Sequence, residues 1–446
     1  MAMNNNQTHA PLYPNHQTDK KRSFMKNLTL LFVICFALVN VVTAQIPAPK
    51  QAGPIVITGA DIHTLTGDVI ENGQILFENG VITEIGQSID YPENAVVVDA
   101  DGKYIYPGLI DSYSQMGLYE IGAVDMTVDL NEQGDVNPNI KTERAFNPES
   151  RHIAIARSAG VLTALSTPGG GLISGQSAAM KMEGWTWDDM TLKSGVALLM
   201  NWPSPGDEYK EELAMIQQVF DDARAYLKAK EAGSGEEHSL ATDTKLESMI
   251  PVLKGERPLL VNANRADQIQ DAITWAGNES LDIIILGGAD AHMVTDHLVK
   301  NDVPVILTAV LTSPNRDWEG YDARYELPAK LFSAGVRFAI GGTSSAPYSH
   351  RLPYEAGAAI AYGLPADEAL NAVTRYPAEI LGLDEHIGTL ETGKRATFLI
   401  TDGHPLEYNT TIEQVYVDGR ESDMMDMHRQ LYEKYKIKKD RMQSTD

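Results

Sequence analysis

Residues 106–117 read Tyr-Pro-Gly-Leu-Ile-Asp-Ser-Tyr-Ser-Gln-Met-Gly. This stretch predicts a short buried strand that ends at Asp111, because a brief apolar run beside a Pro-Gly turn is typical of such strands. Tyr113 and Gln115 follow the strand at alternate positions. Both side chains form hydrogen bonds, and neither is charged at neutral pH. The stretch therefore predicts a buried strand with neutral polar groups just beyond its carboxyl end.

From residue 108 to residue 385, apolar runs alternate with amphipathic stretches. Buried parallel strands are predicted for Val161–Ser166, Gly195–Asn201, Leu259–Asn264, Asp282–Leu286, Val303–Leu307 and Val336–Gly341. Helices are predicted for Glu208–Lys230 and Ala266–Ala276, and a Gly- and Ser-rich insertion for Ala232–Asp243. Strands that alternate with helices over this length predict an α/β fold, a (β/α)8 barrel of the TIM type.

Short strands separated by Asn-Gly, Gly-Asp and Asp-Gly turns flank this region on both sides. We expect residues 53–107 and 386–421 to form the two halves of one β-sandwich domain, because the first segment is too small to bury much core alone. Residues 422–446 are predicted to form a C-terminal helix. Its apolar side chains recur at helical spacing and are expected to pack on the protein surface: Met424, Met427, Leu431 and Tyr435.

The N-terminal region has the pattern of a secretory signal. Residues 1–24 are predicted to be a disordered leader, and residues 25–44 a signal peptide with a short apolar core and a small residue, Ala44, at the cleavage position. The apolar run is shorter than the roughly 20 residues that a membrane span needs. Cleavage would remove four basic residues and one acidic residue, which changes the net charge from −25 to −28. We therefore expect an exported protein, periplasmic or extracellular, without a membrane span.

Charge and cysteine content exclude several classes of function. A net charge of −25 repels nucleic acid, so no nucleic-acid partner is expected. The single cysteine, Cys35, lies inside the predicted signal peptide. The exported form would have no thiol for catalysis, metal binding or a disulfide.

The segment Pro107–Asp111 resembles the first barrel strand of the amidohydrolase superfamily. In that family a His-x-His pair follows and opens the metal site, whereas this chain has Tyr113 and Gln115 at those positions. A phenol and a neutral amide do not replace two imidazoles around a zinc-like ion. The motif at Asp111 matches, and this carboxylate is expected to anchor the loop by hydrogen bonds. The Gly-rich stretch 167–176 resembles the imidazolonepropionase-like branch of the family.

The same resemblance implies further ligand positions on strands five, six and eight. Asn262 stands where strand five of the family commonly ends in histidine, and Ser344 stands where strand eight usually supplies an aspartate. No histidine follows strand six directly, because His292 comes a helical turn later. These changes imply that the metal site is lost and that no cofactor is bound. If the chain is still a hydrolase, a divalent metal such as zinc would be its cofactor.

Neutral hydrogen-bonding groups are left to line the mouth of the predicted barrel. They either hold a small polar ligand or satisfy one another in a filled pocket. The candidate residues are Tyr113, Gln115, Lys181, Asn262, Asn264, Ser344, His350 and Arg351. The Gly-rich stretch is more typical of a structural turn than of a phosphate site, since no Gly-Lys-Ser/Thr follows it.

Three classes of function remain open. The first is a non-catalytic binding or regulatory homologue, a homo-oligomer or a hetero-oligomer with a metal-competent relative. The second is a hydrolase of carbon–nitrogen bonds in cyclic amides, with unconventional or no metal ligands. The third is a cell-surface structural component. Catalysis by a Ser344–His350 pair or by Asp111 and Asp290 would need geometry that spacing does not give.

Overall fold

The computed structural model describes residues 46–232, 241–314, 316–343 and 345–443. The chain divides into two units, Met1–Ile46 and Pro47–Asp446, and the described residues belong almost wholly to the second. The predicted leader and signal peptide, most of the predicted insertion and Ser344 lie outside the described residues.

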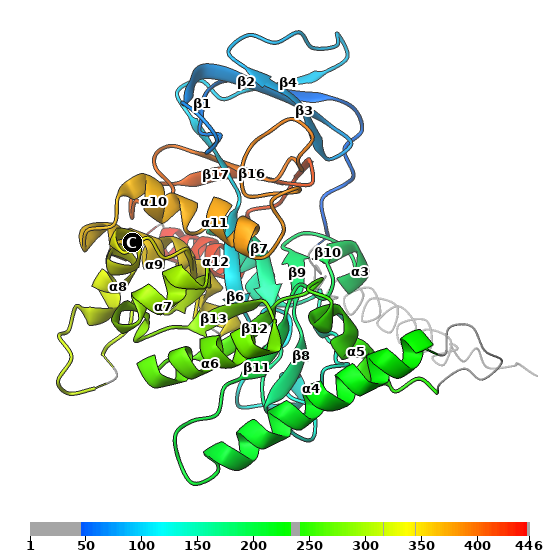
Figure 1. The fold of residues 1–446 in the computed structure, drawn as a ribbon. Coiled ribbons are helices and arrows are strands. Elements are labelled where there is room, and N and C mark those ends of the chain that lie inside the picture. The colour runs from blue at the N-terminus through cyan, green and yellow to red at the C-terminus, as the bar shows by residue number, and fades with distance from the viewer. Residues whose placement is uncertain (1–45, 233–240, 315, 344, 444–446) are drawn as a thin grey trace, which may run out of the picture. The chain divides into compact units, whose positions relative to one another are not determined.

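The two ends of this second unit meet in one eight-stranded sheet (Figure 1). Its N-terminal strands are β1 (Ile55–Ile62), β2 (Ile70–Glu78), β3 (Val81–Gly86), β4 (Val96–Asp99) and β5 (Tyr104–Pro107). Its C-terminal strands are β16 (Phe398–Thr401), β17 (Ile412–Val417) and β18 (Arg420–Glu421). Strand β16 pairs antiparallel with β5, so the pairing joins segments that lie on opposite sides of the central region in the sequence. Phe77, Phe398 and Tyr416 pack ring to ring in the core of this sheet.

The middle of the chain forms two further sheets, in the orders β10-β9-β7-β6 and β15-β14-β13-β12-β11-β8. The parallel strands are β6 (Leu109–Ser114), β7 (Val161–Ser166), β11 (Leu198–Asn201), β12 (Leu259–Ala263), β13 (Ile283–Gly287), β14 (Val305–Thr308) and β15 (Phe338–Gly341). Strands β8 (Ile173–Gln176), β9 (Ala178–Lys181) and β10 (Thr191–Lys193) pair antiparallel with their neighbours. Strand β6 lies next to β15 of the other sheet. The mixed α/β content therefore agrees with the predicted α/β class.

Most predicted strands begin one to three residues later than expected, for local reasons. Leu198 rather than Gly195 starts β11, because Gly195 adopts a φ of +59° and leaves the extended conformation. Phe338 starts β15, because the Val336 N–H donates to the Leu331 carbonyl at the end of the preceding helix. The apolar runs identified the strands correctly, and the turn chemistry shifted their ends.

Helices follow most of the parallel strands. They are α2 (Arg151–Ser158), α3 (Trp187–Met190), α4 (Tyr209–Ala232), α5 (Thr244–Leu253), α6 (Ala266–Glu279), α7 (Thr295–Lys300), α8 (Ala323–Ser333), α9 (Leu352–Ala361), α10 (Ala366–Asn371), α11 (Arg375–Ile380) and α12 (Met427–Gln443). Short 3-10 helices are η1 (Asp125–Thr127), η2 (Thr142–Arg144), η3 (Ala291–Met293) and η4 (Ala346–Arg351). Amphipathic spacing explains α6, which buries Ile269, Ala272, Ile273 and Ala276 on one face. His292 lies in η3, one turn before α7.

The space between the two central sheets is filled by apolar side chains. A single cluster joins Ile110, Leu199, Leu260, Ile284, Leu286, Ile306 and Ala339 from six strands. This packing leaves the carboxyl ends of the parallel strands as the place where polar groups can meet a ligand. Within the described ranges, no helix is both long and apolar enough to cross a membrane.

Candidate ligand site at the strand ends

Side-chain amides form a hydrogen-bonded row across the ends of β11 and β12. The Asn262 Nδ2 donates to the Asn201 Oδ1 at 2.9 Å, and the Asn264 Nδ2 donates to the Asn262 Oδ1 at 3.4 Å. Asn201 in turn donates to the Gly171 carbonyl at 2.8 Å. The structure thus brings together two predicted site residues, Asn262 and Asn264. Asn201 was missed, although it ends a predicted strand in the sequence.

The amide row predicts unequal costs for two alanine substitutions. Asn262→Ala should lower the free energy of unfolding by about 1 kcal/mol, because it removes the half-buried donor to Asn201. Asn264→Ala is the matched control and should cost less than about 0.5 kcal/mol, since Asn264 is exposed and its bond is long. Urea unfolding of the two variants measures the difference. Equal losses in the free energy of unfolding would show that the hydrogen bonds of the amide row do not stabilise the fold.

Asp111, in the middle of β6, anchors this strand to the end of β15. Its Oδ1 accepts the Gly342 N–H at 2.9 Å and the Tyr113 N–H at 3.3 Å. A Cβ at Gly342 would lie 3.0 Å from the other carboxylate oxygen, so glycine permits this close approach. Burial raises the pKa of Asp111 to about 6, although the two backbone hydrogen bonds partly offset that rise. The anchoring role expected for Asp111 is therefore confirmed.

Tyr113 packs against the apolar cluster between the two central sheets. Burial raises the pKa of its phenol, and the nearby Asp111 carboxylate raises it further. A phenol in this setting stays protonated at neutral pH and can donate a hydrogen bond. It is not a ligand for a divalent ion here.

The Gly-rich stretch after β7 packs against the long connection from β6 to α2. The Gly169 N–H donates to the Leu130 carbonyl, and the N–H groups of Leu172 and Ile173 donate to the Asp135 carbonyl. Three of the stretch's backbone donors are therefore engaged within the protein. This arrangement agrees with a structural turn rather than an anion-binding loop.

Four charged side chains lie beside the ends of β13 and β14, and the sequence had pointed to only one of them, Asp290. Arg316 holds Asp290 with two parallel hydrogen bonds of 2.9 and 2.7 Å, so Asp290 is not a free base. Glu355 is fully buried, and its carboxylate accepts the Leu311 N–H; burial raises its pKa. Arg324 is 8% exposed and donates to the Thr308 carbonyl at 2.8 Å. One feature of the sequence could have revealed this buried carboxylate, because Glu355 is the only charged residue in the apolar α9 sequence.

Lys181, another candidate from the sequence, lies at the end of β9. Lys181 pairs with Thr163 in the first half of β7, whereas Ser166 marks the carboxyl end of that strand. Its ammonium forms an ion pair with Asp418 at 2.7 Å, next to β17. The expectation that Lys181 lines the mouth is therefore wrong, because β9 runs antiparallel to β7 and carries Lys181 toward the opposite end.

His350 and Arg351 occur in η4, after β15. The His350 ring lies 6.4 Å from the ring of His428 in α12, and burial lowers the pKa of His350. The Arg351 guanidinium lies 5.7 Å from the ring of Tyr348. Gln115 is half-buried in the turn after β6, where its carbonyl accepts the Leu118 N–H. Among the described residues, no side-chain hydrogen bond joins His350 or Gln115 to the amide row.

The donor set at the strand ends does not suit a divalent metal. Within residues 46–232, 241–314, 316–343 and 345–443, no three His, Cys, Asp or Glu side chains gather closely enough to hold one. The groups present are a phenol and amides, and Asn262 already uses its amide in hydrogen bonds. Transition metals and zinc prefer imidazole, thiolate and carboxylate ligands. The residues therefore do not fit the metal that the resemblance implies.

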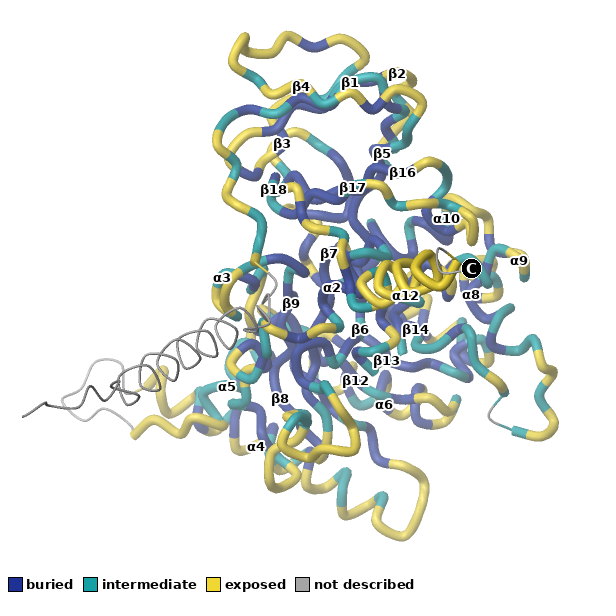
Figure 2. The backbone as a smooth tube through the Cα atoms, turned by 180° about the vertical axis from the view of Figure 1, so that it is seen from behind, coloured by how far each residue is buried: buried dark blue, intermediate teal, exposed yellow. Residues whose placement is uncertain are grey.

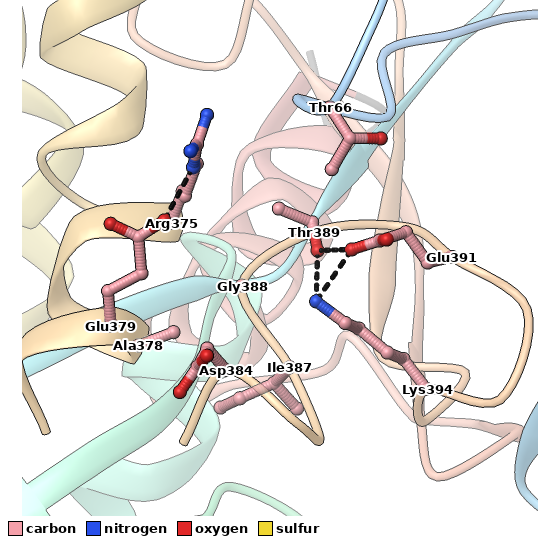
Figure 3. Close-up of a pocket in the computed structure, with 10 residues that line it drawn as sticks. All are labelled: Thr66, Arg375, Ala378, Glu379, Asp384, Ile387, Gly388, Thr389, Glu391 and Lys394. Atoms are coloured by element: carbon pink, nitrogen blue, oxygen red, sulfur yellow. Dashed lines mark hydrogen bonds and ion pairs between the residues drawn. The ribbon is translucent and has the colours of Figure 1, made fainter. Parts of the chain in front are cut away.

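A pocket of about 270 Å³ lies beside α11, and none of the sequence-predicted candidates lines it (Figure 3). Its cations are already paired. Arg375 contacts Glu379 at 2.7 Å, and Lys394 contacts Glu391 at 2.7 Å. Thr66, from the turn after β1, faces the loop that carries Thr389 across the pocket. The pocket has polar walls, but both of its cations are already paired with carboxylates.

Comparison with known proteins identifies the family. A sequence profile of the amidohydrolase family matches residues 288–423. The crystal structure of an amidohydrolase from Thermotoga maritima superposes with a TM-score of 0.76 at 30% identity, and the match covers 82% of this chain and 99% of that one. The chain therefore belongs to the amidohydrolase superfamily.

Curated relatives agree with this assignment. The imidazolonepropionase of Thermoplasma volcanium is 23% identical over 384 residues, which is 79% of this chain and 91% of that protein. Amidohydrolase tasK of Hapsidospora irregularis is 22% identical over 387 residues, 78% of this chain. The match spans only 39% of the length of tasK. The resemblance to imidazolonepropionase-like members is thereby confirmed.

Proposed function

We propose that this protein is an exported, non-catalytic member of the amidohydrolase superfamily that binds a small polar molecule or regulates a partner. The observation that carries the proposal is the amide row. Asn262 occupies a position at which the family resemblance implies a histidine ligand, and its amide is bonded to Asn201 and Asn264. A side chain engaged in this way does not coordinate a metal, and neutral amides suit recognition of polar groups.

The proposal includes a closed (β/α)8 barrel beside a β-sandwich. Closure is supported by the neighbouring positions of β6 and β15 and by the single residue, Ser177, that separates β8 from β9. Export rests on the signal-like residues 25–44. The proposal also includes assembly of the protein with itself or with a metal-competent homologue.

A second candidate function is hydrolysis of carbon–nitrogen bonds in cyclic amides. It is favoured by the imidazolonepropionases among the relatives and by Asp111, whose raised pKa of about 6 would suit a general base. However, Asp111 is fully buried and already accepts two backbone N–H groups. We therefore rank this function second.

Metal content and turnover test the two functions against each other. The protein from residue 45 onward should purify with well under one zinc, manganese or iron ion per chain. Dialysis against a buffer that contains zinc should not raise this metal content. It should not turn over lactams or imidazolones. The variant Tyr113→His/Gln115→His restores the His-x-His pair and should retain more zinc than the unmodified protein. Near-stoichiometric metal in the unmodified protein, or turnover abolished by a chelator, would overturn the first proposal.

A further inference from the structure

Helix α12 presents an apolar stripe that nothing in the described chain covers. Met427, Leu431, Tyr435 and Met442 lie four, four and seven residues apart, and therefore on one face of the helix. Beyond the half-buried Met427, Leu431 is 42% exposed, Tyr435 57% and Met442 64%. The expectation that the C-terminal stripe packs on the surface holds for Met424 and Met427 and is wrong for Leu431 and Tyr435. Figure 2 shows this helix as an exposed element.

The start of α12 is nonetheless fixed to the protein. Asp426 accepts the N–H groups of His428 and Arg429 and so caps the helix. The Ser158 hydroxyl at the end of α2 donates to the same carboxylate at 2.7 Å. Met424 packs against the main core just before the helix begins. The exposed stripe is therefore held in a defined position.

The charge of α12 is opposite to that of the rest of the chain. The helix contains six basic and two acidic residues, a net charge of +4, so the remainder of the chain carries −29. Two α12 helices would repel each other, which disfavours a coiled coil between them. An acidic surface fits instead, and a second copy of this chain supplies one.

Helix α4 provides an acidic face of matching form. Glu211, Met215, Gln218, Asp222 and Ala225 recur at helical spacing and are all exposed. Met215 and Ala225 can contact apolar side chains, while Glu211 and Asp222 can pair with lysines. We call these five residues the α4 outer stripe.

We propose that α12 of one copy docks on the α4 outer stripe of a second copy, and that the contact is reciprocal. A 17-residue helix is about 25 Å long and about 10 Å wide, so one face offers roughly 250 Å². One such contact buries roughly 500 Å² on both partners, below the roughly 1,000 Å² that a specific interface needs. Two reciprocal contacts in a twofold dimer reach that size. This inference is independent of whether the protein is catalytic.

Sedimentation of the protein from residue 45 onward tests the dimer. We expect a monomer–dimer equilibrium that weakens as salt rises, because charge pairs contribute to it. Lys438→Glu, on the same face of α12 as the apolar stripe, should raise the Kd about tenfold or more. Lys436→Glu is the matched control on another side of the helix and should leave the Kd within about twofold. Asp222→Lys should restore association to the Lys438→Glu variant.

Any of the following four outcomes would overturn the proposal. Association that survives both Lys438→Glu and Leu431→Ser would exclude α12 as the contact. Loss of association without rescue by Asp222→Lys would exclude the α4 outer stripe. A protein that stays monomeric and binds phosphatidylglycerol vesicles through Lys438 would show that α12 docks on lipid instead. A monomer that binds no vesicles would show that the stripe has no such partner.

Discussion

Replacement of Arg157 by methionine should lower the free energy of unfolding by about 3–5 kcal/mol, the largest effect expected in this molecule. Arg157 and Glu183 form an ion pair of 2.9 Å, and their side chains are only 3% and 2% exposed. The Arg157 guanidinium also donates to the carbonyls of Met182 and Asp423. Removing it would leave the Glu183 carboxylate buried without its counter-charge, and that desolvation penalty is the reason for the loss.

Two matched variants separate this penalty from a general effect of losing an arginine. Arg337 pairs with Asp302 at 2.9 Å on the surface, so Arg337→Met should cost less than about 1 kcal/mol. The double variant Arg157→Met/Glu183→Leu should recover much of the loss, since it removes both charges together. Urea unfolding measures all three. A loss below 1 kcal/mol for Arg157→Met would show that water reaches the pair.

The buried pair also joins segments that are far apart in the sequence. Glu183 accepts the Ala48 N–H at 2.9 Å, and Arg157 donates to the Asp423 carbonyl shortly before α12. The beginning of the described chain and the start of α12 are therefore both bonded to one ion pair. We expect the Arg157→Met variant to be cut more readily by proteases at these two segments.

The sequence predicted the central strands because their signals are local. Val161–Ser166 was predicted residue for residue, since an apolar run follows Gly160, whose φ of +84° ends the preceding helix. Helices α4 and α6 were found by their periodic apolar faces. The anchoring role of Asp111 was also correct, but the predicted strand end was wrong, because β6 continues past Asp111 to Ser114.

Features that depend on tertiary contacts were not predictable in the same way. The direction of β9 depends on its pairing with β7, so the sequence did not show that Lys181 lies far from the mouth. Arg316 and Asp290 are 26 residues apart, and no local pattern reports their bidentate contact. The stripe on α12 was recognised as apolar, but periodicity cannot distinguish a face that packs within the chain from one that awaits a partner.

Asp111→Asn should stabilise the protein at neutral pH by up to about 3 kcal/mol, because the ionised carboxylate is costly where it is buried. The pKa of Asp111 is about 6 in the folded protein, against a usual value of 3.8. Well below pH 3.8 the carboxyl is protonated in both states and contributes no difference. Between pH 4 and 6 the folded state holds the proton more tightly, so stability falls as the pH rises. Above pH 6 the full penalty remains.

The asparagine variant separates charge from hydrogen bonding. Its amide oxygen can still accept the N–H groups of Gly342 and Tyr113, so the anchor between β6 and β15 should survive. Asp111→Ala removes the acceptor as well and should be less stable than Asp111→Asn at every pH. Thermal unfolding from pH 4 to pH 8 should therefore show a gap between Asp111→Asn and the unmodified protein that opens with rising pH. A gap that is constant across this range would mean that Asp111 titrates normally, and that its carboxylate is solvated despite its burial.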